Sequence, residues 1–171
     1  TLFRSLGSTR LRVQGVSHPS LGGLFLSQCL HSLSWRMPQL VIVPTSEDLQ
    51  KFVESLELFD PSLKVYTLPE LDVHAYSGLF PNQKQIRARL RFYHHAQKAR
   101  NGDIFLATAN ALMQKTLPYK VLADQTITLR IGDEWSANLN AHLQRLNYQQ
   151  VPLVEDPGQW AVRGGIIDVF S

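Results

Sequence analysis

The chain has 171 residues, of which 44% are hydrophobic and 18% charged, proportions typical of a globular protein and not of a disordered one. Its formal net charge of +3 is too small to indicate nucleic-acid binding by itself. The single cysteine, Cys29, excludes an internal disulfide, and without a partner at metal-ligand spacing it favours a buried side chain over a nucleophile. No apolar run is long enough to span a membrane, and residues 1–12 lack a signal-peptide core, so the sequence predicts a cytoplasmic protein without a membrane partner.

The first predicted elements are a short strand, Leu11–Gln14, a loop of small residues and a helix, Leu24–Leu33. Strand, loop and helix is the layout of a P-loop, in which backbone amides, a lysine and a hydroxyl hold phosphates and magnesium. Aligned on Gly15, the motif would place its second glycine, its lysine and its hydroxyl at Ser20, Leu21 and Gly22. Every side chain that handles charge is absent, so the sequence predicts a strand-to-helix turn that binds neither ATP nor another cofactor.

Three more predicted strands alternate with helices, a pattern that indicates a parallel α/β layer. The strands are Leu40–Val43, Lys64–Leu68 and Asp103–Ala107; the helices run from a cap at Thr45 to about Phe59, over Gln83–Arg100 and over Ala109–Gln114. The continuous apolar run Leu40–Val43 predicts a strand buried on both faces. The connection Pro69–Asn82 is predicted to be irregular.

The predicted helix Gln83–Arg100 carries a basic stripe opposite an apolar face of Ile86, Leu90 and Tyr93. The stripe consists of Lys84, Arg87, Arg91 and Lys98. Such a stripe can follow phosphates, but it is also typical of a solvated helix face, and no aromatic residues interleave with it. We therefore expect at most weak, non-specific DNA binding. The adjacent His94 and His95 point in different directions on a helix and cannot hold a metal together.

The pattern changes near Pro118. A β-like run, Thr126–Ile131, is followed by a helix, Ser136–Asn147, and by three short strands within Val151–Ser171. This order predicts two domains, an α/β domain at residues 1–118 and a smaller α+β domain at 119–171. The acidic pair at Asp133 and Glu134 suits the start of the helix better than a magnesium site, because the preceding strand is amphipathic and not buried. No catalytic or metal-binding residue is predicted.

Within Val151–Ser171, Arg163 is the residue that most clearly indicates a binding role. It ends the predicted strand Gln159–Arg163 directly before Gly164, in a hairpin whose second strand is Ile166–Phe170. At a strand end beside a glycine pair, a guanidinium is exposed and can meet a carboxylate through two hydrogen bonds. A solvated arginine without a partner is the alternative that the sequence leaves open.

The run EDPGQWAVRGGIIDVF, residues 155–170, resembles a long segment shared by UvrB-type damage-recognition subunits and the N-terminal module of bacterial transcription-repair coupling factors. Three further segments resemble the same families: YSGLFPNQKQIRARL, GDIFLATANALMQKTLP and TLRIGDEWSANLNAHLQRLNY. Two departures favour the coupling factors, because the P-loop is eroded and Asp72–Pro81 is too short for the DNA-clamping hairpin of the UvrB-type subunits.

The resemblance implies a degenerate RecA-like domain followed by a smaller UvrA-binding domain, the domain 2 of these families, here truncated at its C-terminus. It implies that Arg163 and Gly164 contact UvrA, and that the chain is a non-catalytic adaptor that recruits UvrA to stalled RNA polymerase in nucleotide excision repair. The full-length family members also bind RNA polymerase and DNA and are ATP-dependent DNA translocases. The alternatives are a RecA-like ATPase or helicase lobe, or a fragment of a UvrB-type subunit.

Overall fold

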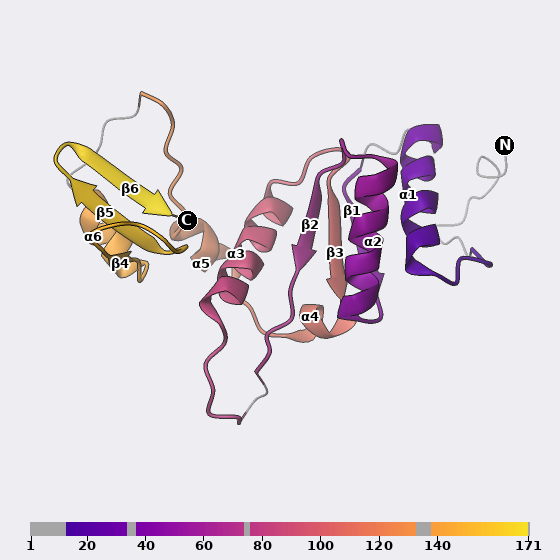
Figure 1. Ribbon diagram of the computed structural model, residues 1–171, viewed down its shortest axis with the longest axis horizontal. Helices are drawn as coiled ribbons and strands as arrows, with labels where there is room; N and C mark the ends of the chain where they lie inside the picture. Colours follow the sequence, from indigo (N-terminus) through magenta and orange to yellow (C-terminus); the bar gives the residue numbers. More distant parts are fainter. Residues whose placement is uncertain (1–12, 34–36, 74–75, 133–137, 171) are drawn as a thin grey trace. The chain divides into compact units, whose positions relative to one another are not determined.

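The computed structural model describes residues 13–33, 37–73, 76–132 and 138–170 (Figure 1). The chain forms two compact units, Thr1–Thr116 and Leu117–Ser171. Both are mixed α/β structures, the first with a parallel three-stranded sheet and the second with a mixed three-stranded sheet.

The sheet of the first unit has the strand order β1-β3-β2, with all neighbours parallel. Its strands are β1 (Gln39–Val43), β2 (Val65–Leu68) and β3 (Ile104–Thr108). Helices α1 (Pro19–Leu33) and α2 (Ser46–Phe59) lie on one side of the sheet and α3 (Gln83–Gln97) on the other, as Figure 1 shows, while the short α4 (Ala109–Met113) follows β3 directly. This arrangement brings the carboxyl ends of the three strands to one edge.

The central strand β3 carries the core of this unit, since all five of its residues are buried. On one face Ile104 and Leu106 pack with Phe52 and Leu56 of α2. On the other face the ring of Phe105 packs edge to face against the ring of Phe92 in α3 and stacks with the ring of Tyr66 in β2. The predicted strand–helix alternation from β1 to α4 is confirmed, with element ends that differ by a few residues.

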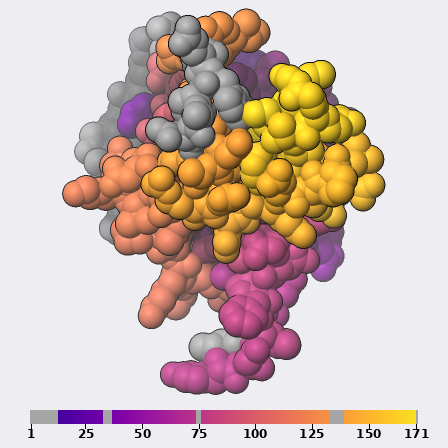
Figure 2. Space-filling model, turned by 90° about the vertical axis from the view of Figure 1, so that its left-hand side faces the viewer, coloured from indigo at the N-terminus to yellow at the C-terminus, as the bar shows by residue number. Residues whose placement is uncertain are grey.

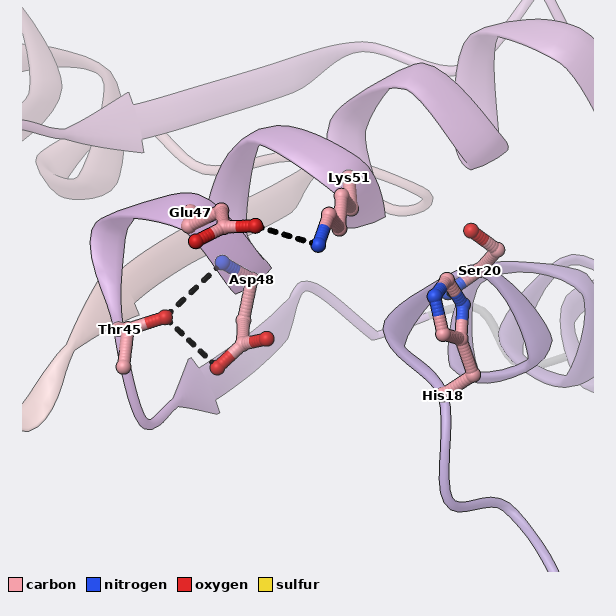
Figure 3. A network of polar contacts seen from close by, with 6 residues as sticks. All are labelled: His18, Ser20, Thr45, Glu47, Asp48 and Lys51. Atoms are coloured by element: carbon pink, nitrogen blue, oxygen red, sulfur yellow. Dashed lines mark hydrogen bonds and ion pairs between the residues drawn. The ribbon is translucent and has the colours of Figure 1, made fainter.

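The start of α2 shows why the chain turns into a helix at that point (Figure 3). The Thr45 hydroxyl accepts a hydrogen bond from the Asp48 backbone N–H at 3.0 Å and donates one to the Asp48 carboxylate at 2.7 Å. Within the first turns, Lys51 forms an ion pair of 2.6 Å with Glu47. A hydroxyl N-cap and acids in the first turn satisfy free N–H groups and the helix dipole, as the sequence predicts.

The predicted strand Leu11–Gln14 is wrong for the part that the structure describes, because Val13 and Gln14 belong to no strand and are exposed. Leu11 and Arg12 lie outside the described residues. Helix α1 also begins earlier than predicted, at Pro19, a residue whose fixed φ suits the first helical position. The ring of His18 accepts a hydrogen bond from the Ser20 N–H at 3.3 Å, and Figure 3 shows both residues at the start of α1.

The glycine pair Gly22 and Gly23 lies inside α1, where it lets α1 approach α2 closely. A Cβ on Gly22 would lie 2.7 Å from the Phe52 ring, and one on Gly23 would lie 2.4 Å from the Ser55 hydroxyl. That hydroxyl donates a hydrogen bond of 2.6 Å to the Ser20 carbonyl, which joins the two helices. The glycines that resembled a phosphate-binding loop therefore have a packing role here.

The prediction that Leu40–Val43 is buried on both faces is also wrong. Strand β1 pairs only with β3 among the described residues, so it is an edge strand. Helix α3 packs over β2 and β3, and the residues of β1 on that face, Leu40 and Ile42, remain 58% and 55% exposed. The opposite face is covered, with Val43 buried against α2 and β3.

The second unit contains α5 (Tyr119–Asp124), α6 (Asn138–Arg145) and a sheet of β4 (Gln149–Gln150), β5 (Gln159–Arg163) and β6 (Ile166–Phe170). Strand β4 pairs parallel with β5, and β5 pairs antiparallel with β6. Its core consists of Trp160, Leu139 and Leu143, with Tyr148 and Ile167 packed against it. Figure 2 shows one face of this unit, in orange and yellow.

Two expectations for this unit need correction. The β-like run Thr126–Ile131 forms no strand; these residues follow α5 as an irregular segment in which Leu129 and Ile131 are exposed. The third strand lies at Gln149–Gln150 and not within Val151–Ser171, because residues 151–158 form turns that lead into β5. The acidic pair Asp133 and Glu134 lies outside the described residues.

No helix among the described residues is long and apolar enough to cross a membrane. Cys29 is buried in α1, as predicted, and burial raises the pKa of its thiol.

Candidate functional site

The candidate site lies on the hairpin of β5 and β6. Arg163 pairs with Ile166 across the turn, so Gly164 and Gly165 form a two-residue connection. Gly164 has a φ of +60°, and a glycine at the first central position is what a tight hairpin turn of this kind requires. The role of Gly164 in the site is therefore to form the turn that ends β5. Arg163 is then the last residue of the strand, at the tip of the hairpin.

The Arg163 side chain is 57% exposed, as the sequence predicts, but it has a partner within the hairpin. One terminal nitrogen, Nη2, donates a hydrogen bond of 2.6 Å to the carboxylate Oδ2 of Asp168. Asp168 pairs in the sheet with Ala161, two residues before Arg163, so the ion pair runs diagonally across the two strands on one face. The sequence analysis did not single out Asp168. Asp168 lies two residues after Ile166 on β6, so both lie on the same face of the hairpin as Arg163, which pairs with Ile166.

The ion pair lies beside partly exposed apolar side chains. A shallow concavity of about 390 Å³ is lined by Leu153, Val154, Arg163, Asp168, Val169 and Phe170. Leu153 and Phe170 are about half exposed, and Ile166 beside the turn is more exposed still. A partly exposed arginine beside apolar side chains can serve as a protein-binding surface, because arginine is among the residues that contribute most to binding where the surrounding contacts exclude water.

The residues of the eroded P-loop do not form a comparable site. Gly15 precedes α1 with a φ of +87°, and among the described residues no other part of the chain comes within 4 Å of a Cβ placed on it. Ser20, Leu21 and Gly22 belong to the first turns of α1, so their backbone N–H groups are part of a helix and not of a loop. Leu21 is exposed, and Gly22 faces Phe52.

A second polar cluster, which the sequence analysis missed, lies at the carboxyl edge of the parallel sheet. The Glu70 carboxylate, just after β2, accepts hydrogen bonds from Thr108 at the end of β3, from Asn110 at 2.6 Å and from Ser46 at 3.4 Å. It borders a concavity of about 310 Å³. The Glu70 carboxylate thus connects the carboxyl ends of three strands through hydrogen bonds. Its oxygens already accept three hydrogen bonds within the protein, so we assign it a structural role.

These hydrogen bonds, with that from Thr108 the largest cause, lower the pKa of Glu70. The carboxylate therefore stabilises the folded state fully above the ordinary pKa of a glutamate, and this contribution is lost as pH falls through the lower folded pKa. We expect Glu70→Gln to lower the unfolding free energy at pH 7 and to have a smaller effect near pH 3, measured by urea denaturation. Asn110→Ala, which removes one donor, should show a weaker form of the same pH dependence. A Glu70→Gln effect of equal size at both pH values would contradict this role.

The basic stripe and the histidines complete the predicted residues. Lys84, Arg91 and Lys98 are exposed on or just after α3, whereas Arg87 is half-buried. His95 stacks on Tyr66 with ring centroids 4.4 Å apart, and burial is the main cause that lowers the pKa of His94. Within residues 13–33, 37–73, 76–132 and 138–170, no three His, Cys, Asp or Glu side chains are grouped closely enough to hold a metal ion.

Comparison with known proteins identifies relatives of both units. Residues 127–171 match the family model of the UvrB interaction domain. The transcription-repair-coupling factor of Myxococcus xanthus is 28% identical over 169 residues, which are 95% of this chain and 14% of that protein. The same factor of Haemophilus influenzae is 31% identical over 110 residues, 64% of this chain and 10% of that protein. That of Escherichia coli is 24% identical over 134 residues, 78% of this chain and 12% of that protein.

The chain thus spans no more than about a seventh of the length of these relatives. The family match falls on the unit that contains the Arg163 hairpin. The chain is a homologue of the transcription-repair-coupling factors, and its residues 127–171 match the UvrB interaction domain.

Proposed function

We propose that the chain is a non-catalytic adaptor that binds UvrA through the hairpin of its second unit. One observation carries this proposal: the match to the UvrB interaction domain falls on the unit in which an exposed arginine lines a shallow concavity. In a longer coupling factor, such a contact would recruit UvrA to RNA polymerase stalled on DNA. RNA polymerase and DNA are proposed as partners of that longer protein, which would be the ATP-dependent translocase.

The chemistry of the surface fits a protein partner with an acidic group. The guanidinium of Arg163 has five N–H donors, and the hydrogen bond to Asp168 uses one of them. A carboxylate of UvrA can bind the remaining donors, while the apolar side chains of Leu153 and Phe170 exclude water around that contact. Arg163 and Gly164 are thus proposed as site residues, the first by direct contact and the second by the turn that it forms.

For the first unit we propose a degenerate RecA-like domain at residues 1–118, with the UvrA-binding domain at residues 119–171. The parallel order β1-β3-β2 with helices on both faces supports this proposal. The unit offers phosphates neither a lysine nor a magnesium ligand where the P-loop would need them, since those positions are Leu21 and Gly22 within a helix.

We expect Arg163→Ala to weaken UvrA binding by about 2 kcal/mol, roughly thirtyfold in Kd, because a charge-assisted contact at an interface centre is lost. Calorimetric titration of the 171-residue chain with UvrA measures the change. Arg163→Lys should restore only part of the affinity, since an ammonium keeps the charge but lacks the planar fork.

Arg145→Ala is the matched control. Arg145 is exposed on α6 of the same unit, and its substitution removes the same charge. It should leave the affinity nearly unchanged. Equal effects of the two substitutions would mean that general charge and not the Arg163 contact attracts UvrA, and unchanged binding by a folded Arg163→Ala chain would remove Arg163 from the site.

Magnesium-ATP should not stabilise the chain. A ligand present at 100 times its Kd raises the unfolding free energy by about 2.7 kcal/mol, a shift that thermal melting detects easily. A clear increase in Tm with magnesium-ATP would contradict the non-catalytic role and favour a RecA-like ATPase lobe with an unusual nucleotide site near Gly15.

A further inference from the structure

The exposed ion pair between Arg163 and Asp168 is better placed to serve binding than to hold the hairpin together. The two strands already pair over five residue positions, from Gln159 with Phe170 to Arg163 with Ile166. The buried face of the hairpin contributes Trp160 and Ile167 to the core of the unit. An ion pair whose side chains are 57% and 38% exposed adds only about 0–1 kcal/mol to stability in water.

We infer that Asp168 is a positioning residue for UvrA binding, which holds the Arg163 guanidinium in the orientation that meets a carboxylate of the partner. This inference rests on the proposed function, because it needs Arg163 to be the contact. An arginine at a hairpin tip has many rotamers, and fixing such a side chain on binding costs about 0.5–1.5 kcal/mol. A diagonal hydrogen bond of 2.6 Å restricts those rotamers before the partner arrives.

The geometry leaves room for two carboxylates on one guanidinium. Asp168 accepts from Nη2, so Nε and Nη1 keep their N–H groups for the partner. Both side chains line the same concavity, together with Leu153 and Phe170. The partner therefore adds a carboxylate to the arginine and does not have to displace Asp168.

A double-mutant cycle tests this role. UvrA affinity is measured by calorimetry for the 171-residue chain and for its Asp168→Ala, Arg163→Ala and doubly substituted forms. Asp168→Ala alone should weaken binding by about 2- to 12-fold, the factor that corresponds to the cost of fixing one arginine side chain. In the Arg163→Ala background, Asp168→Ala should change the affinity by less than about twofold, because no guanidinium remains to be positioned.

Conservative variants and a charge control sharpen the cycle. Asp168→Glu should recover part of the affinity, since its longer carboxylate still reaches the exposed guanidinium. Asp124→Ala removes the same charge from the exposed surface of α5 and should leave binding unchanged. Melting curves for all variants should agree within a few degrees, as expected for exposed substitutions.

Each other outcome overturns the inference in a distinguishable way. Tighter binding by Asp168→Ala would show that the aspartate competes with UvrA for the guanidinium. An equal loss in the presence and absence of Arg163 would show a role independent of the arginine. Normal affinity of Asp168→Ala beside weak binding of Arg163→Ala would refute positioning and keep the proposed function. Absence of UvrA binding by the unsubstituted chain would refute both.

Discussion

Trp160→Ala is expected to lower the unfolding free energy of the second unit by about 3–5 kcal/mol, the usual cost of truncating a buried tryptophan. Trp160 is 1% exposed and is the largest side chain in a core that it shares with Leu139 and Leu143. A unit below about 70 residues rarely gains more than about 3–5 kcal/mol from a single core. We therefore expect the second unit to be largely unfolded in this variant, and UvrA binding to be lost with it.

Val162→Ala is the matched control, because Val162 lies two residues along β5 and on the same face but is exposed. It should change stability by no more than about 0.5 kcal/mol. Hydrogen exchange resolves the two units, since only amides of residues 117–171 should lose protection in Trp160→Ala. Persistent protection in β5 and β6 would show that the hairpin does not depend on this core.

Arg89→Ala is expected to cost the first unit about 3–5 kcal/mol, because buried charge-assisted hydrogen bonds are worth about 1.5–3 kcal/mol each and their acceptors would be left without donors. Arg89 is 4% exposed in α3. Its guanidinium donates to the carbonyl of Pro69 at 2.7 Å, to that of Ala111 at 3.0 Å and to the side chain of Gln114 at 3.2 Å. It thus connects α3 to the segment after β2 and to the end of α4.

Arg89→Lys should recover only part of this stability, because one ammonium cannot span acceptors on two separate segments. Arg91→Ala, an exposed substitution on the same helix, should cost about 0.5 kcal/mol or less. Urea denaturation followed by circular dichroism measures both. An Arg89→Ala chain as stable as Arg91→Ala would show that water replaces the guanidinium at these carbonyls.

Trp160 and Arg89 show that the two units have different roles. Trp160 supports the hairpin from its buried face, while Arg163 and Asp168 lie on the other face. Arg89, like Glu70, fixes the carboxyl edge of the parallel sheet with hydrogen bonds inside the protein. In the first unit the polar groups at that edge therefore serve the fold, and the surface proposed for partner binding belongs to the second unit.

The sequence by itself determined the elements whose signals are local. The hydroxyl at Thr45 with acids behind it predicted the start of α2, and the glycine pair at Gly164 predicted the hairpin of β5 and β6. The exposed position of Arg163 followed from the same turn. Capping and tight turns depend on residues within a few positions of one another, so a linear pattern contains them.

Only the tertiary structure decided which side chains of each strand and helix are buried and which are exposed. The run Leu40–Val43 is equally apolar whether its strand is central or at an edge, and the position of α3 left Leu40 and Ile42 exposed. The buried face of α3 contains Arg89 and Phe92 and is not centred on the predicted Ile86, Leu90 and Tyr93. An arginine counts as polar in any periodic pattern, and only carbonyls from distant segments make its burial favourable.

The glycines at Gly22 and Gly23 show the same limit, because glycine suits both a phosphate-binding turn and a close helix contact, and the distance to α2 selects the second. The partnership of Arg163 with Asp168 likewise depends on strand register, which the pairing of β5 with β6 sets. Contacts between residues far apart in sequence depend on packing and register, and neither is present in composition or local spacing.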